Sequence, residues 1–190
     1  MNYLNHRNKV ILVSKNDEII GVEDKLSAHR GNGKRHRAFS VFITNDMGKL
    51  LIQKRASGKY HAGSLWSNTV CSHPQPGEDI LVSAQDRLQE ELGFTTSVQN
   101  FSKIEYKEKV GDNLTEWELD YLFWGEVSRV MLMPDPDEVE DVAWVDIDKL
   151  LKDISDKPEN YTSWFPLILP EFNNFIKLQR SLLRDPVLGL

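Results

Sequence analysis

The chain has 190 residues, which suits one domain of ordinary size and is too short for two full-sized ones. Apolar residues make up 40% and charged residues 27%, a balance that excludes collagen-like and disordered proteins. The formal charge of -6, from 29 acids against 23 bases, argues against the broad basic face of a nucleic-acid-binding protein. An anionic substrate therefore needs a locally positive pocket.

The first third of the chain predicts strands separated by a loop. A strand over 10–13 is followed by a polar stretch over 23–37, which predicts a loop. Apolar runs over 38–44 and 49–53 flank a short turn that contains Gly48, which is the pattern of a β-hairpin.

The middle of the chain predicts a strand, a helix and a second hairpin. A short strand over 65–71 ends at the sequence SHPQPG. Apolar residues at intervals of three and four predict a helix over 78–92, and Gly93 lies where that helix ends. Aromatic-rich runs over 98–109 and 114–127 predict the hairpin.

The last third predicts a strand over 139–145 and then a short helix capped by Asp146 or Asp148. A helical apolar pattern follows over 164–183. Because proline interrupts helices, we expect Pro166 and Pro170 to confine the regular helix to the later part of this tail.

Hairpins mixed with helices of this length predict an α/β fold of the α+β type, in which a mixed β-sheet lies between α-helices. We expect a single domain over 1–190. Cys71 is the sole cysteine, no apolar run approaches the roughly 20 residues of a membrane span, and the N-terminal apolar stretch VILV is a poor secretory signal. We therefore expect a cytoplasmic protein without membrane contact.

The predicted helix ends in a sequence that resembles the Nudix box, whose pattern is G-x5-E-x7-R-E-U-x-E-E-x-G-U with U apolar. Aligned on Gly93, Glu78 falls on the first glutamate, and Glu90 and Glu91 fall on the paired glutamates. Arg87 stands where the pattern has a carboxylate. A guanidinium removes a metal ligand and supplies a bidentate phosphate donor, so we expect this helix to bind a diphosphate without readily hydrolysing it.

Histidines and glutamates predict a metal site. His29, His36 and His73 lie beside predicted turns or strand ends, where they can converge. Glu116 and Glu118 are two apart on a predicted strand, so their side chains share one face. Three imidazoles and two carboxylates suit Mn²⁺ or Mg²⁺ in octahedral geometry, with Zn²⁺ as an alternative. Taken singly, each histidine is more often a surface or hydrogen-bonded residue than a ligand.

Cys71 admits three interpretations. A free cysteine is usually a small buried apolar residue. It can also be a further metal ligand beside the histidines. The third interpretation is an acid/base thiol near a cation, with a pKa shifted by the local charge.

Three stretches together resemble type 1 isopentenyl-diphosphate Δ-isomerases, a family with the Nudix fold: KLSAH with HRAFS, then WSNTVCSHP, and finally EWE. The similarity covers about residues 10–165, with a Nudix-like core over about 34–168. The resemblance implies interconversion of isopentenyl and dimethylallyl diphosphates in isoprenoid biosynthesis, without flavin or nicotinamide.

The resemblance also implies roles for individual residues. The implied catalytic residues either move protons or face a cationic intermediate, and they are Cys71, Glu118, Tyr106 and Trp164. The cations that bind the diphosphate are Lys25, Arg55, Lys59 and Arg87. The metal ligands are His29, His36, His73, Glu116 and Glu118, and Glu91 matches the acid that holds a second Mg²⁺ bound with the diphosphate.

Such a reaction adds a proton at one carbon and removes one from another. Cys71 and Glu118 come from different predicted strands, so they can face opposite sides of a flat alkene. We expect metal-held Glu118, assisted by Tyr106, to deliver one proton and the Cys71 thiolate to receive the other, with the roles exchanged in reverse. Trp164 is expected to offer a π face to the developing cation.

Two other functions fit parts of the sequence. Glu78, Glu90 and Glu91 suit a Nudix diphosphohydrolase, although Arg87 and Cys71 argue against it. A non-enzymatic binding domain with a structural zinc is the other alternative. For the isomerase that the resemblance implies, we expect a monomer or homodimer whose partner is a small diphosphate substrate and neither nucleic acid nor membrane.

Overall fold

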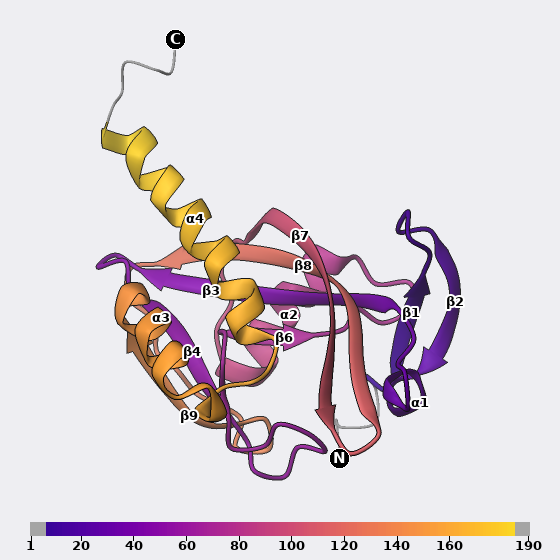
Figure 1. Ribbon diagram of the computed structural model, residues 1–190. Helices are drawn as coiled ribbons and strands as arrows, with labels where there is room; N and C mark the ends of the chain where they lie inside the picture. The colour runs from indigo at the N-terminus through magenta and orange to yellow at the C-terminus, as the bar shows by residue number, and fades with distance from the viewer. Residues whose placement is uncertain (1–6, 185–190) are drawn as a thin grey trace.

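The computed structural model describes residues 7–184, whose strands form one nine-stranded mixed sheet with helices on both sides (Figure 1). The strands are β1 (Lys9–Val13), β2 (Ile19–Asp24), β3 (His36–Asn45), β4 (Leu50–Arg55), β5 (Trp66–Ser67), β6 (Val70–Ser72), β7 (Gln99–Gly111), β8 (Leu114–Val127) and β9 (Val139–Val145). The helices are α1 (Lys25–His29), α2 (Ile80–Leu92), α3 (Ile147–Asp156), the 3-10 turn η2 (Pro158–Asn160) and α4 (Phe165–Arg184).

Residues 1–6 and 185–190 lie outside the described residues, and with them the start of the segment assessed for a secretory signal. Among the helices within 7–184, none combines the length and apolar content that a membrane span requires.

Strand β3 is the centre of the sheet. It pairs antiparallel with β1, β4 and β6, and parallel with β8. Strand β2 extends the sheet beyond β1, β7 pairs with β8, and both β5 and β9 pair with β4. These pairings confirm the mixed sheet and both predicted hairpins.

Alternate residues of β3 divide the core between the two faces of the sheet. Phe42 packs with α3 and α4, and its ring stacks on Phe172 with 4.4 Å between centroids. Phe39 and Ile43 pack on the other face, where α2 contributes Leu88. Burying each of these side chains stabilises the fold by roughly 1.5 to 3 kcal/mol, so β3 is held from both sides.

The prediction of a loop over 23–37 is wrong, because this segment contains the end of β2 and the helix α1. The Asp24 side chain caps α1 by accepting a hydrogen bond from the Ser27 amide. Ala28 and His29 are its buried residues. A five-residue helix is too short to show an apolar period, so the sequence pattern did not reveal it.

The predicted start of the last helix is also wrong. Pro166 and Pro170 were expected to delay the regular helix, yet α4 begins at Phe165. Pro166 lies in the first turn, where an amide hydrogen has no partner within the helix. Pro170 removes one hydrogen bond, and the burial of side chains such as Phe165 and Phe172 outweighs that loss.

The strand predicted over 65–71 is divided into β5 and β6. Asn68 and Thr69, both buried, separate them. The Thr69 hydroxyl accepts from the Ile43 amide at 2.9 Å and donates to the Leu51 carbonyl at 2.6 Å. These bonds replace strand pairing at this point, so β5 pairs with β4 while β6 crosses to β3.

Gly93 ends α2 with a φ of 76°, and a Cβ at this position would lie 2.7 Å from the Cβ of Met133. We expect Gly93→Ala to lower the free energy of unfolding by about 2 kcal/mol or more, because left-handed backbone costs roughly 1 to 2 kcal/mol and Met133 must also move. Urea unfolding measures the loss. Gly77→Ala is the matched control, since its φ is 87° but its Cβ would meet open space. Equal losses in the two variants would contradict the packing argument.

Candidate active site and metal centre

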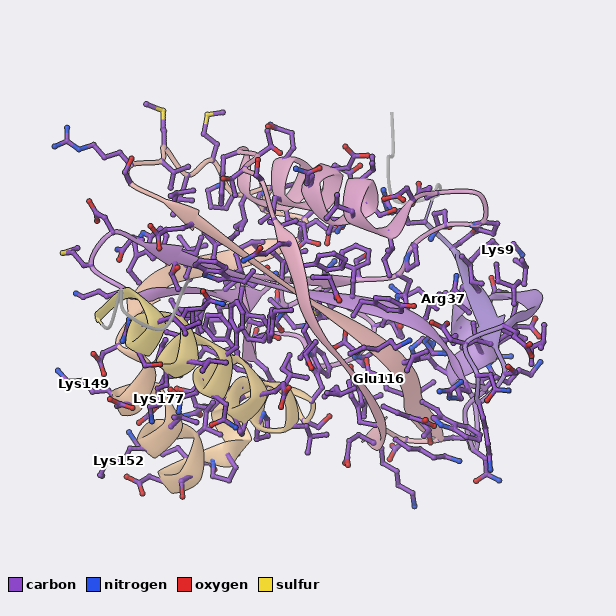
Figure 2. The ribbon with its side chains drawn as sticks, turned by 90° about the horizontal axis from the view of Figure 1, so that it is seen from above. Lys9, Arg37, Glu116, Lys149, Lys152 and Lys177 are labelled. Atoms are coloured by element: carbon purple, nitrogen blue, oxygen red, sulfur yellow. The ribbon has the colours of Figure 1, made fainter. Side chains whose placement is uncertain are left out.

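Strand β8 contributes two buried glutamates to the face of the sheet that α4 covers. Glu116 and Glu118 are 4% and 5% exposed. The parallel register of β3 and β8 places Glu118 opposite His36. Figure 2 shows the labelled lysines of α3 and α4, Lys149, Lys152 and Lys177, at the outer edge of the molecule, away from Glu116.

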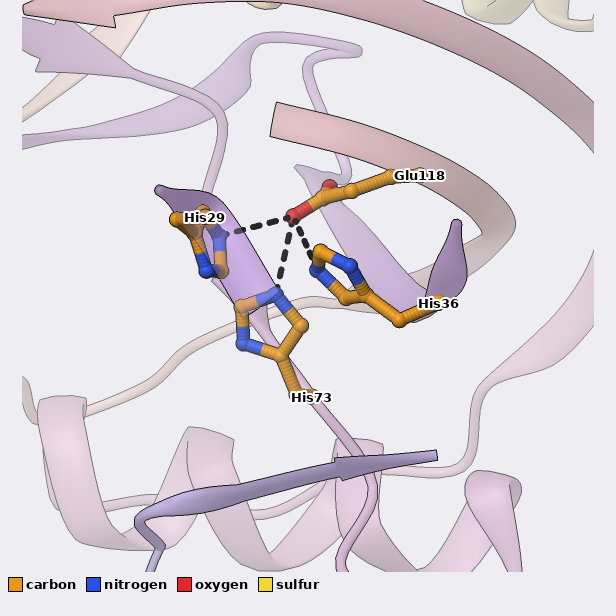
Figure 3. Close-up of side chains that lie close together, drawn as sticks. All are labelled: His29, His36, His73 and Glu118. Atoms are coloured by element: carbon orange, nitrogen blue, oxygen red, sulfur yellow. Dashed lines mark hydrogen bonds and ion pairs between the residues drawn. The ribbon is translucent and has the colours of Figure 1, made fainter. Parts of the chain in front are cut away.

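Three histidines from different elements converge on Glu118 (Figure 3). His29 ends α1, His36 begins β3, and His73 directly follows β6. Their Nε2 atoms lie 3.9, 3.4 and 2.8 Å from Glu118 Oε1. The structure thus brings together four of the five ligands predicted for the metal site.

The orientation of two rings leaves lone pairs directed at the carboxylate. The Nδ1 atoms of His29 and His36 lie 2.6 and 2.7 Å from the carbonyl oxygens of Lys25 and Lys34. A carbonyl only accepts, so each Nδ1 carries the hydrogen, and the Nε2 atom is the one left for a metal. Within residues 7–184, neither Nε2 has a hydrogen-bond partner. Buried lone pairs around a carboxylate fit a bound divalent cation, and a backbone carbonyl on the second nitrogen is usual for metal-binding histidines.

The pKa directions agree with this arrangement. Burial lowers the pKa of His29 to about 4 and that of His73 to about 3, so both rings are neutral near pH 7. Burial alone would raise the pKa of Glu118, but contacts with His36 and His73 hold it well below its usual value. Burial and the adjacent Glu118 charge raise the pKa of Glu116 well above its usual value. Neutral imidazoles and an ionised carboxylate are the forms that bind metals, so the directions at His29, His73 and Glu118 fit a metal site, whereas the raised pKa of Glu116 favours its neutral acid.

Glu116, the fifth predicted ligand, belongs to a second group of donors. Its Oε1 lies 3.4 Å from His61 Nε2, and these two residues form a possible metal-binding group with His29. The sequence analysis missed His61, because it lies in a polar segment between β4 and β5 with no motif around it. Burial lowers its pKa to about 2, with further lowering by the Arg55 charge.

A cavity of about 40 Å³ lies beside these donors. All four residues predicted to move protons or face a cation line it: Cys71, Glu118, Tyr106 and Trp164. Cys71 comes from β6 and Glu118 from β8, on opposite sides of β3. The Tyr106 hydroxyl donates to Glu118 Oε2 at 2.5 Å. The cavity therefore places a thiol and a carboxylate around one enclosed space.

Cys71 is partly buried and lies near a guanidinium. Burial raises the pKa of its thiol to about 12, although Arg55, with NH1 3.8 Å from Sγ, acts in the opposite direction. The same guanidinium lies over the Trp164 ring, 5.4 Å from its centroid. Arg55 thus contacts both the predicted catalytic thiol and the predicted π face.

The four cations predicted to bind diphosphate lie near one another. Lys25 and Arg55 line the cavity. Burial lowers the pKa of Lys25 to about 8, and repulsion by Arg55, Lys59 and Arg87 lowers it further. Like charges that destabilise one another mark a site that an anion would stabilise.

Two of these cations are paired with acids of the chain. Arg87 donates hydrogen bonds to Glu91 at 3.0 Å and to Glu90 at 2.6 Å. The Arg87 guanidinium also lies 3.1 Å from Glu138. Lys59 pairs with the same Glu138 carboxylate. Sequence reasoning did not select Glu138, whose position before β9 matches no quoted motif. The acids of α2 are therefore already neutralised by the arginine that replaces a carboxylate of the box.

Glu78 lies apart from this group. It precedes α2, and its carboxylate accepts from the Gln75 amide at 2.9 Å and from the Ser83 hydroxyl at 2.6 Å. It also pairs with Arg7 at 3.0 Å. These contacts stabilise the start of α2 and leave no direct link between Glu78 and Glu91.

Comparisons with known proteins agree on the fold and on one group of relatives. The model of the NUDIX domain matches residues 34–165. Two proteins of Aromatoleum aromaticum named isopentenyl-diphosphate Delta-isomerase 1 and 2 are 44% and 40% identical to this chain, over 82% and 85% of its length and 87% and 84% of theirs. An isopentenyl-diphosphate Delta-isomerase of Pectobacterium atrosepticum is 38% identical over 91% of this chain and 97% of its own length.

Solved structures show the same fold at low identity. DR0079 of Deinococcus radiodurans superimposes with a TM-score of 0.68 at 19% identity, covering 86% of this chain and 98% of its own. A MutT protein of Methanosarcina mazei gives 0.62 at 16% identity, covering 75% and 96%.

If the buried histidines hold a cation, Mn²⁺ will stabilise the folded chain. At 100 times the dissociation constant, binding adds about 2.7 kcal/mol, which raises the melting temperature by about 5 to 10 °C in a chain of this size. We expect His36→Ala to remove most of this rise, and Glu78→Gln, which changes a carboxylate outside the cluster, to keep it. Thermal melts with and without Mn²⁺ measure the shift. An undiminished rise in His36→Ala would place the cation elsewhere.

Proposed function

The chain belongs to the isopentenyl-diphosphate Delta-isomerase family, whose members share the Nudix domain, and we propose that it isomerises isopentenyl diphosphate to dimethylallyl diphosphate. This is a step of isoprenoid biosynthesis. The supporting observation is that Cys71 and Glu118 line one cavity from different strands, beside candidate metal ligands and clustered cations.

The reaction needs two proton-transfer groups and no redox cofactor. One group adds a proton to the terminal carbon of the alkene, and the other removes a proton from the carbon nearer the diphosphate. Glu118 and Cys71 are these groups, and Tyr106, hydrogen-bonded to Glu118, delivers or returns the proton on the carboxylate side. The sequence assignment has Glu118 give a proton and Cys71 receive one, whereas the pKa directions in the structure favour a protonated Cys71 thiol that gives and an ionised Glu118 that receives. The reverse reaction exchanges the two roles.

The residues that would hold the first cation, Mn²⁺ or Mg²⁺ with Zn²⁺ as an alternative, are His29, His36, His73, Glu116 and Glu118. When bound, this cation supplies a positive charge that keeps Glu118 ionised and fixed in orientation. His29 and His36 need no ring rotation to present Nε2, because backbone carbonyls already fix their Nδ1 atoms.

The diphosphate anchors the substrate and does not react. Lys25 and Arg55 are at the cavity and supply donors directly. Lys59 and Arg87 complete the positive charge, and Glu91, which is paired with Arg87, would hold a Mg²⁺ that accompanies the diphosphate. Anchoring at one end holds the alkene between the two proton-transfer groups, which lowers the entropic cost of reaction.

The cationic intermediate requires a dry site with a π face. Trp164 is 2% exposed, and its ring already faces the guanidinium of Arg55. The face of a buried aromatic ring stabilises a nearby cation, such as a carbocation-like intermediate, by roughly 2 kcal/mol or more when water is excluded. Trp164 therefore supports the carbocation-like state.

We further propose that residues 1–190 act as one domain, as a monomer or homodimer in the cytoplasm. Strands β1 and β2 extend the sheet that contains the matched segment, which supports a single unit. The partner is a small diphosphate substrate and neither nucleic acid nor membrane.

Labelled isopentenyl diphosphate with Mg²⁺ tests the activity, and Cys71→Ser tests the thiol. We expect the wild type to form dimethylallyl diphosphate and Cys71→Ser to lose about 10²- to 10⁴-fold in rate, the usual contribution of a positioned acid/base group. Its melting temperature and metal content should match the wild type. Release of phosphate or pyrophosphate without dimethylallyl product would favour a hydrolase. Unfolding or metal loss in Cys71→Ser would favour a structural zinc site.

Glu118→Gln tests the carboxylate with almost no change in shape. We expect it to abolish turnover, because an amide neither shuttles this proton nor binds a cation as a carboxylate does. Glu126→Gln is the matched control, since Glu126 is an exposed glutamate on the same strand. Initial rates from the labelled assay make the comparison, and a near-normal rate for Glu118→Gln would remove this residue from the mechanism.

A further inference from the structure

His61 is a buried side chain that the proposed mechanism does not use. It lies in the segment between β4 and β5, which is closed by backbone hydrogen bonds that join Arg55 to Ser64 and Leu65. The imidazole is 9% exposed and lines the same cavity as Cys71. A polar ring buried at the tip of a surface segment needs a partner inside the molecule.

Two groups of candidate ligands share His29. One contains His29, His36, His73 and Glu118, and the other contains His29, His61 and Glu116. Within each group the ligand atoms lie within 4.8 Å of one another. An octahedral ion with bonds of about 2.1 Å holds opposite ligand atoms roughly 4.2 Å apart, so each group is close to the size of one coordination sphere.

His29 connects the two groups to a single ion. Its Nδ1 lies 2.6 Å from the Lys25 carbonyl, so only Nε2 is left to bind a metal. One nitrogen lone pair binds one cation. The donors of both groups lie within 4.8 Å of the His29 ligand atom, so His61 and Glu116 need only close the remaining distance to a cation held there with His36, His73 and Glu118.

The contact between His61 and Glu116 is not a satisfied pair. Their Nε2 and Oε1 atoms are 3.4 Å apart, which is long for a direct hydrogen bond, and Glu116 Oε2 has no hydrogen-bond partner within residues 7–184. Leaving a buried carboxylate oxygen without a partner is costly. A cation between His61, Glu116 and His29 would pair with the Glu116 carboxylate and with the Nε2 atoms of both rings, while His61 Nδ1 would keep no partner among these residues.

We propose that His61 is a sixth protein ligand of the cation bound at His29, which completes an octahedron of four imidazoles and two carboxylates. The proposal rests on the proposed function for the presence of a divalent cation at this site. Because imidazole suits Co²⁺, Ni²⁺ and Zn²⁺ while Mg²⁺ prefers oxygen ligands, the added nitrogen shifts the site toward the softer ions.

Cobalt tests the ligand, because Co²⁺ binds imidazole well and its visible absorption reports its donor atoms. The protein is stripped of divalent ions with a chelator and titrated with Co²⁺, following both affinity and spectrum. We expect His61→Ala to weaken Co²⁺ binding about 10-fold or more, as loss of a group around a metal typically does. The absorption band should move to longer wavelength where water replaces nitrogen, or strengthen where the position stays open.

Two further variants separate a ligand from a positioning residue. In His61→Gln the side-chain amide can still donate a hydrogen bond to Glu116 but is a poor cobalt ligand, so we expect a loss like that of His61→Ala. Tyr60→Phe is the control for the segment and should bind Co²⁺ as the wild type does. Normal affinity and spectrum in His61→Ala, or in His61→Gln alone, would overturn the proposal.

The titration is independent of the isomerase assay. A wild type that binds Co²⁺ with a His61-dependent spectrum but forms no dimethylallyl diphosphate would overturn the proposed function and leave the ligand assignment intact. An active enzyme whose cobalt spectrum is unchanged in His61→Ala would support the proposed function and overturn the ligand assignment.

Discussion

A carboxylate buried under the sheet sets the main constraint on this protein. Glu118 is 5% exposed, and an isolated charge in that position would cost several kcal/mol. The chain supplies Tyr106 and His73 as direct partners and places His29 and His36 close by. This requirement explains why a five-residue helix, the first residue of β3 and the residue after β6 all converge on one strand.

Lys25 links the two halves of the site. Its backbone carbonyl fixes the ring of His29, while its side chain belongs to the cation cluster at the cavity. A displacement of α1 would therefore disturb the histidine cluster and the diphosphate-binding cations together. The cations at the cavity also favour one orientation of the proposed substrate, with its anionic end at Lys25 and Arg55 and the alkene between Cys71 and Glu118.

Most strands, both hairpins and α2 could be predicted because their signals are local, whereas β2 was not predicted. Gly93, for example, ends α2 in left-handed backbone as its position predicted. The helix α1 could not, because a cap at Asp24 and two buried residues stabilise it without an apolar period. Long-range pairing was equally invisible: nothing near His61 or Glu138 in the sequence indicates Glu116 or Arg87 as neighbours. Residues inside a motif were found, and residues brought in by the fold alone were missed.

The helix α2 shows how this scaffold separates binding from chemistry. In a helix that presents several free carboxylates, a divalent cation beside a diphosphate helps to activate water. Here Arg87 occupies one of those positions and engages Glu90, Glu91 and Glu138, so the charge left for a cation on this helix is small. The strongest donor set lies instead on β8, around Glu118, beneath α4 rather than on α2. Moving the metal-binding acids from a solvent-facing helix to a buried strand removes water from their surroundings, which is the condition a carbocation-like intermediate requires.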